Sequence, residues 1–92
     1  MFNSIHNRFR ELIRAGQVTI STHAEEEMDA DAISSEKVLN VLKDGDITGR
    51  QRDRITGEWK YLFSGSAIGL QVVVVAKISV NNRVFIITVF PL

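Results

Sequence analysis

The segment THAEEEM, residues 22–28, holds the side chains best suited to acid or base chemistry. In a helix, Glu26 and Glu27 lie beside His23 because they follow it by three and four positions. A carboxylate in that place could orient or charge the imidazole, which is the relation that a general acid or base needs. The same pattern fits a locally hydrogen-bonded histidine with no chemical role, and the residues alone leave both interpretations open.

Metal and cofactor chemistry has no support in the sequence. The only other histidine, His6, falls on another predicted helix, and no second histidine stands at a ligand spacing from His23. The chain has no cysteine, so it can form neither a thiolate metal site nor a disulfide. It also lacks the phosphate-loop, dinucleotide-binding and serine-elbow motifs. We therefore expect no metal and no cofactor, which leaves metal-free acid and base chemistry or binding.

A row of arginines is the second candidate site. In the segment RQRDR, Arg50, Arg52 and Arg54 occupy every second position, and such side chains share one face of a strand. Guanidinium groups match phosphate oxygens, so this row could grip an RNA backbone or stabilise developing negative charge. The alternative is an exposed edge strand that its charges protect from aggregation.

The segment EWKYLFSG predicts a strand with two different faces. Trp59, Tyr61 and Phe63 share one face, and Lys60 lies on the other. Exposed aromatic rings can stack on the bases of single-stranded RNA. The sequence favours core packing against the helices instead, with the hydroxyl of Tyr61 kept in water.

The elements that must position these residues form a helical half followed by a strand-rich half. Spacings of three and four predict a first helix from Phe2, Ile5, Phe9, Leu12 and Ile13. A short strand over residues 17–21 precedes two helices, over residues 23–28 and 36–44. Four strand-like segments follow as two hairpins, over residues 47–65 and 70–90. The apolar run 72–76 predicts a central strand that is buried on both faces.

Capping and turn residues support these boundaries. Thr22 and Glu25 form a capping-box pattern at the start of the second helix. The other predicted caps and turns are Ser34 or Ser35 and Gly45 around the third helix, Thr56 with Gly57, and Asn81 with Asn82 as a type I′ turn. Together the patterns predict one α+β domain over residues 1–92, with N-terminal helices packed on a four-stranded antiparallel meander sheet.

Composition and charge narrow the classes of function. The 92 residues are 45% hydrophobic and 24% charged, which is typical of a folded domain. The net charge of zero hides five basic against nine acidic residues in positions 1–46, and six against two in positions 47–92. The basic half could present a local anion-binding face. The apolar run is too short to cross a membrane and the N-terminus lacks a secretion signal, so we expect a cytoplasmic protein.

Four segments, in this order, resemble the family called domain of unknown function 4258: ISTHAEEEM, AISSEKVLNVLKDGDI, EWKYLFSG and VFIITVF. The resemblance covers residues 17–90 and depends on the order of the segments. It implies membership of the RelE-like group of small α+β proteins, which includes the ribonuclease toxins of bacterial toxin–antitoxin pairs.

The resemblance also implies a reaction and its residues. It implies RNA as the substrate, an antitoxin protein as the partner, and metal-free cleavage in which a ribose 2′-hydroxyl attacks the adjacent phosphate. At the matching positions, His23 would be the acid or base, Lys60 an electrostatic stabiliser, Tyr61 a hydrogen-bonding or stacking group, and Thr88 the threonine of the final strand. Arg50, Arg52 and Arg54 would contact RNA, and one of them would assist Lys60.

The chain departs from the family pattern beside His23. Glu27 stands where the family usually has an arginine before its methionine, and Asp29 and Asp31 stand where a second arginine commonly follows. Carboxylates repel a polyanionic substrate. The second hypothesis is therefore a non-catalytic protein-binding module that kept the scaffold and lost the catalytic cations, with contacts through an exposed strand edge or the acidic helix face. A homodimer through a sheet edge is a further expectation.

Overall fold

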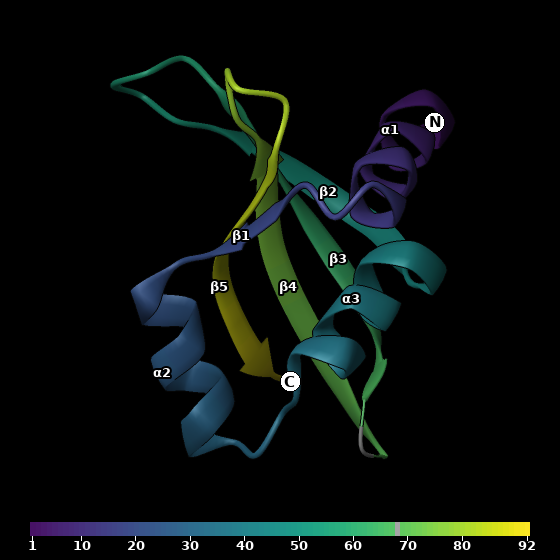
Figure 1. Ribbon diagram of the computed structural model, residues 1–92, viewed down its shortest axis with the longest axis vertical. Coiled ribbons are helices and arrows are strands. Elements are labelled where there is room, and N and C mark those ends of the chain that lie inside the picture. Colours follow the sequence, from purple (N-terminus) through teal and green to yellow (C-terminus); the bar gives the residue numbers. More distant parts are fainter. Residues whose placement is uncertain (68) are drawn as a thin grey trace.

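The valine-rich strand β4 (Leu70–Ile78) lies at the centre of a five-stranded sheet with the order β1-β5-β4-β3-β2. The computed structural model in Figure 1 describes residues 1–67 and 69–92. Val72, Val74 and Ala76 are fully buried, and Val73 on the other face is 7% exposed. The predicted central position of this strand is therefore confirmed. Burial on both faces is only partial, because Val75 on the second face is half-buried and Gln71 is exposed.

Three helices and four further strands complete the fold. The helices are α1 (Asn3–Arg14), α2 (Thr22–Ala30) and α3 (Ser35–Asp44). The other strands are β1 (Val18–Ile20), β2 (Asp46–Arg52), β3 (Trp59–Ala67) and β5 (Val84–Pro91). Each predicted helix and strand is present, with boundaries that differ by a few residues.

The prediction of a four-stranded antiparallel meander is wrong by one strand. β2, β3, β4 and β5 do pair as an antiparallel meander. The short strand β1 then joins β5 in parallel, with Val18 opposite Val84 and Ile20 opposite Ile86, so the sheet is mixed. A parallel pair needs a long connection, here the whole chain between β1 and β5, and local sequence patterns carry no signal of such a pairing.

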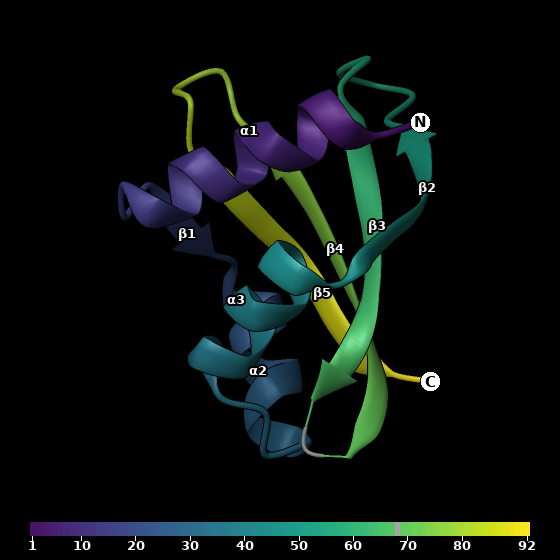
Figure 2. The ribbon, with the colours of Figure 1, turned by 90° about the vertical axis from the view of Figure 1, so that its right-hand side faces the viewer.

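The core lies between the sheet and the helices (Figure 2). Phe9 of α1 meets Phe63 of β3 edge to face, with the ring centres 4.9 Å apart, and both side chains are fully buried. Leu42 of α3 is also fully buried. Burying three large apolar side chains stabilises the fold by about 1.5–3 kcal/mol each. The helices thus shield one face of β3 and β4, while the side chains on the other face lie outside this core.

The ends of the helices show which capping predictions hold. Ser34 caps α3, because its hydroxyl accepts a hydrogen bond from the amide of Lys37 at 3.3 Å. The start of α2 is capped by Ser21, whose hydroxyl accepts from the amide of Ala24 at 3.0 Å. The predicted cap Thr22 is already the first helical residue, so the predicted capping box is displaced by one position.

The β4–β5 turn differs from the predicted type I′ turn. Only Asn82 of the central pair has a positive φ, of 56°, whereas type I′ requires it at both residues. The amide of Ser79 donates to the carbonyl of Arg83 at 2.9 Å, and the amide of Asn82 donates to the carbonyl of Ser79 at 3.0 Å. The hairpin is therefore closed by a loop longer than two residues, in which Asn82 alone adopts the left-handed conformation.

Candidate functional site

The first cluster joins two of the predicted catalytic residues. His23 begins α2, and its Nε2 atom lies 3.4 Å from the Oε1 atom of Glu27, one helical turn further. The same oxygen accepts a hydrogen bond from the hydroxyl of Thr88 on β5 at 2.8 Å. His23 and Thr88, 65 positions apart in the numbering, therefore meet through a carboxylate. The side chain of His23 is 67% exposed, so most of the ring is in solvent.

Glu27 also accepts a hydrogen bond from the backbone of the sheet. Its Oε1 atom accepts from the amide of Val89 at 2.9 Å, at the part of β5 beyond the end of β1. A buried amide without a partner costs free energy, so this carboxylate replaces the strand that is missing there. Glu27, which departs from the family pattern, thus contacts both His23 and Thr88.

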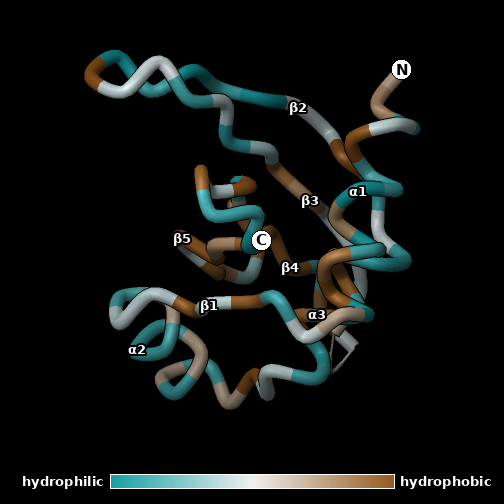
Figure 3. Tube along the Cα trace, turned by 45° about the horizontal axis from the view of Figure 1, so that its top comes forward, coloured by the Kyte–Doolittle hydropathy of each residue, from teal (hydrophilic) through white to brown (hydrophobic). Residues whose placement is uncertain are grey.

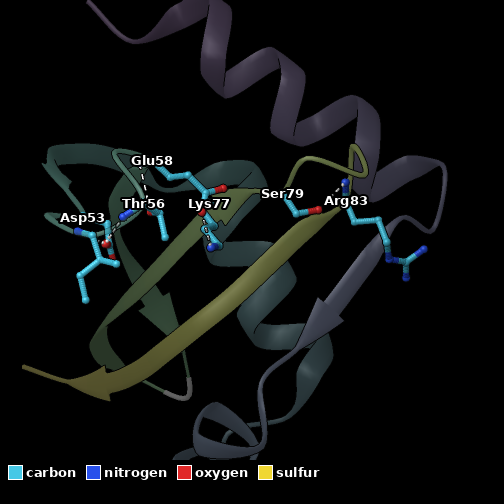
Figure 4. Close-up of polar contacts among 7 residues, drawn as sticks. Asp53, Thr56, Glu58, Lys77, Ser79 and Arg83 are labelled. Carbon is cyan, nitrogen blue, oxygen red and sulfur yellow. Dashed lines mark hydrogen bonds and ion pairs between the residues drawn. The ribbon is translucent and has the colours of Figure 1, made fainter.

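The second cluster lies on the sheet face away from the helices and includes Lys60. A hollow of about 200 Å³ is lined by Asp53, Glu58, Lys60, Lys77, Phe85 and Ile87. Within it, the Nζ atom of Lys77 lies 3.0 Å from the Oε1 atom of Glu58 (Figure 4). The two lysines are balanced by two carboxylates, so the hollow carries no excess positive charge for a phosphate.

Strand register separates Lys60 from the first cluster. Lys60 on β3 stands level with Lys77 on β4, while Thr88 on β5 stands opposite Val75. The backbone positions of Lys60 and Thr88 are therefore two strands apart, about 10 Å across the sheet, and about 7 Å apart along it. Among the described residues, no hydrogen bond or ion pair joins Lys60 to His23, Glu27 or Thr88, so these side chains lie in separate clusters.

Tyr61 lies on the face of β3 opposite Lys60. Its ring packs edge to face against Phe2 at 6.1 Å and Phe9 at 5.8 Å between ring centres. Only 9% of the residue is exposed. The expected core packing of this face is confirmed, and the position of Tyr61 suits packing more than contact with the second cluster.

The third cluster contains two of the predicted RNA-binding arginines. Arg50 and Arg52 share one face of β2, as their spacing predicts, and lie opposite Tyr61 and Trp59 in the register. Their guanidinium carbons are 3.9 Å and 4.5 Å from the centre of the Trp59 ring. Arg54 follows the end of β2, in the exposed turn before β3. β2 is three strands from β5, so this cluster is about 14 Å across the sheet from Thr88.

The two edges of the sheet differ in how they are protected. The carbonyl of Gln17 accepts from the amide of Val84, so the carbonyl of the next residue, Val18, points away from β5. The Nη2 atom of Arg83 donates to that outward carbonyl at 2.9 Å. Arg83 at the short strand β1 and Glu27 beyond its end therefore occupy backbone groups that an added strand would need.

The opposite edge is β2, where no hydrogen bond within residues 1–67 and 69–92 occupies the outward backbone groups of Arg50 and Arg52. The amide of Asp53 donates to the carbonyl of Glu58 at 2.9 Å, so it points toward β3. Backbone groups of successive residues in a strand alternate between its two sides, which directs those of Arg52 and Arg50 outward. Figure 3 shows hydrophilic residues along much of β2 and the loop that follows it. The seven-residue strand β2 thus presents an edge that Arg50 and Arg52 line with both backbone and side chain.

Two further findings bear on ligands and membranes. Among residues 1–67 and 69–92, no three His, Cys, Asp or Glu side chains gather as a metal site would require. In that same part of the chain, none of the helices has the length and apolar character needed to cross a bilayer.

Sequence patterns did not reveal the partners of these residues. The alternation of RQRDR correctly placed Arg50 and Arg52 on one face, but the register that brings Trp59 against them depends on long-range pairing. The sequence placed Glu27 beside His23, but its contacts with Thr88 and Val89 on β5 join segments that are remote in the sequence. Lys77 and Glu58 carried no motif that could have drawn attention to them.

Comparisons with known proteins place the chain in a family. Comparisons with curated proteins and with solved structures gave no significant match. A family model described as a domain of unknown function, DUF4258, matches residues 20–91. This match spans α2 and α3, strands β2 to β5, and hence His23, Glu27 and Thr88. The chain therefore belongs to the DUF4258 family.

Proposed function

We propose that this protein is a non-catalytic binding module that takes up an extended segment of another protein at the outer edge of β2. Adding a strand to a sheet edge is a common mode of protein recognition, in which backbone hydrogen bonds supply affinity and alternate side chains supply specificity. One observation carries the proposal: the sheet has one protected edge and one free edge. Arg83 occupies the outward carbonyl of Val18 and Glu27 occupies the amide of Val89, whereas the outward backbone groups of Arg50 and Arg52 have no such contact among the described residues.

The surroundings of His23 support binding over catalysis. The charged partner of His23 is Glu27, and α2 carries two more glutamates, Glu25 and Glu26, in the same turn. Cleavage of a phosphodiester needs cations that stabilise charge in the transition state. The arginines that would supply them are stacked on Trp59, three strands away. A polyanion at His23 would meet carboxylates instead.

The experiment is to pan a displayed library of short extended peptides on the whole protein and to measure amide hydrogen exchange with each enriched peptide. The outward amides of Arg50 and Arg52 exchange freely in the unbound edge, and an added strand would slow them. We expect slower exchange at these two residues and little change at Val18 on the other edge, where Arg83 already occupies the outward carbonyl. Enriched peptides that leave both arginine amides unchanged would refute the proposal.

A metal-independent ribonuclease of the RelE-like toxin type is the second candidate. The observation that favours it is the meeting of His23 and Thr88, two residues that the resemblance assigned to catalysis, at one carboxylate. Expression of the protein beside His23→Ala and Lys60→Ala variants tests it, with growth arrest and RNA cleavage as readouts. Activity that both substitutions abolish would support the ribonuclease, and equal behaviour of the three proteins would reject the catalytic assignment.

A further inference from the structure

Two guanidinium groups share a single indole ring at the free edge of the sheet. The guanidinium carbons of Arg50 and Arg52 lie 3.9 Å and 4.5 Å from the centre of the Trp59 ring. Cation–π attraction of this kind holds each guanidinium group over the ring. A guanidinium group that stacks on a ring by its flat face keeps its N–H edges available for other partners. We call Arg50, Trp59 and Arg52 the arginine clamp.

The arginine clamp has cations that are oriented but not neutralised. Among the described residues, neither Arg50 nor Arg52 has a carboxylate within 4.0 Å, although Arg8, His23 and Lys77 each have one. A side chain held in place before binding loses less conformational entropy when it binds. Planar guanidinium groups match carboxylates with two parallel hydrogen bonds. The clamp is therefore suited to binding two carboxylates.

Backbone geometry fixes where those carboxylates would lie. Arg50 and Arg52 are two positions apart on β2, so their backbone groups both point outward and their side chains both lie on one face of the sheet. A residue that pairs with Arg50 in an added strand has its side chain on that same face, directly opposite. The same holds for Arg52, two positions away. The two matching residues of the added strand are also two positions apart.

We propose that β2 selects an extended protein segment with two acidic residues separated by one other residue, and that the arginine clamp binds both carboxylates. This inference rests on the proposed function, because it names the chemistry of the segment that the β2 edge takes up. The acidic pair would add charge-assisted hydrogen bonds to the backbone ladder that any extended segment forms.

Two other occupants fit the edge less well. A second copy of this chain paired through β2 would bring arginine rows together, and like charges on neighbouring strands are destabilising. RNA could place phosphates on the clamp, but it has no backbone groups that match the outward amides and carbonyls of Arg50 and Arg52. An acidic peptide uses the edge and the clamp together.

The test compares two blocked peptides that differ only at the acidic pair. One is a soluble β-prone peptide with two glutamates separated by one residue, and its twin has glutamine at both positions. Trp59, the only tryptophan in the chain, reports binding by its fluorescence. We expect the glutamate peptide to bind at least about tenfold more tightly, a preference that salt weakens. Arg50→Gln combined with Arg52→Gln should abolish the preference, while the matched control Arg54→Gln keeps it.

The outcomes distinguish the role of the arginine clamp from the proposed binding of a segment at the β2 edge. If both peptides bind equally and slow the amides of Arg50 and Arg52, the clamp inference is overturned and the edge proposal stands. If neither peptide slows these amides while a single-stranded RNA oligonucleotide binds, both are overturned. Persistent binding of the glutamine peptide to the double variant shows that the variant is folded. A charge-reversed variant, Arg50→Glu with Arg52→Glu, should prefer a lysine peptide.

Discussion

The Oε1 atom of Glu27 lies 2.9 Å from the backbone nitrogen of Val89, which joins α2 to the last strand of the sheet beyond the end of β1. The same oxygen accepts from the hydroxyl of Thr88 and stands 3.4 Å from His23. Glu27 therefore links a helix, a strand and an exposed histidine, and it stabilises the structure whatever the function of His23.

Glu27→Ala should lower the free energy of unfolding by about 1–3 kcal/mol, because it leaves the amide of Val89 without its acceptor. Glu27→Gln should lose less, since an amide oxygen can still accept from the backbone. Chemical denaturation followed by circular dichroism measures both. His23→Ala is the control and should change stability by less than about 0.5 kcal/mol, because the ring is mostly exposed. A larger loss for His23→Ala than for Glu27→Ala would contradict this role.

Gly45→Ala should destabilise the protein by more than about 2 kcal/mol, because there is no room for a side chain. A Cβ atom at Gly45 would lie 2.5 Å from the carbonyl oxygens of Ser64 and Val41, both of which are backbone atoms. Gly49→Ala is the matched control, since nothing lies within 4 Å of a Cβ there, and its effect should stay below about 1 kcal/mol. Equal unfolding midpoints for the two variants would show that the contact between α3 and β3 is looser than described.

His6 should hold its ring proton on Nε2. This atom lies 2.8 Å from the carbonyl oxygen of Leu42, and Nδ1 lies 3.4 Å from the Nη2 atom of Arg10, which can only donate. The ring also meets Phe63 edge to face at 5.4 Å. Nitrogen chemical shifts of the imidazole measure the tautomer directly. Finding the proton on Nδ1 would require a different partner for the carbonyl of Leu42.

The turn after β2 should weaken in acid. Hydrogen bonds from the backbone amides of Thr56 and Ile55 lower the pKa of Asp53 below its usual value of 3.8. Because the folded pKa lies below the unfolded one, this stabilisation is present above about pH 3.8 and is lost as the pH falls through the folded pKa. Carbon chemical shifts of the carboxyl should titrate below 3.8. In Asp53→Asn, order in the turn should no longer change over that range, and a midpoint above 3.8 would contradict the assignment.

Local patterns predicted the parts of this fold that depend on neighbours in the sequence. The alternation of Trp59, Tyr61 and Phe63 predicted the face of β3 that packs on the core. The serine pair at 34 and 35 predicted the start of α3, and Ser34 is the residue that caps it, because capping is a local property. The apolar run of β4 correctly indicated the central strand, although only one of its faces is fully buried.

Contacts between remote segments could not be predicted in the same way. The parallel pairing of Val18 with Val84 joins residues from opposite halves of the chain. The stacking of Arg50 and Arg52 on Trp59 requires the register of β2 on β3, which a bulge between Ile47 and Gly49 shifts by one residue. A shift of one position moves every later side chain to the other face of the sheet. The candidate site therefore depends on the strand register, which cannot be predicted from local sequence patterns.

Hydrogen exchange at the amides of Arg50 and Arg52, measured with and without a bound segment from another protein, tests the central claim most directly. An added strand at the β2 edge should slow both amides together, while the amide of Gln51, which points toward β3, keeps its rate. Binding that leaves Arg50 and Arg52 unchanged and protects residues around His23 instead would contradict the assignment of β2 as the binding edge.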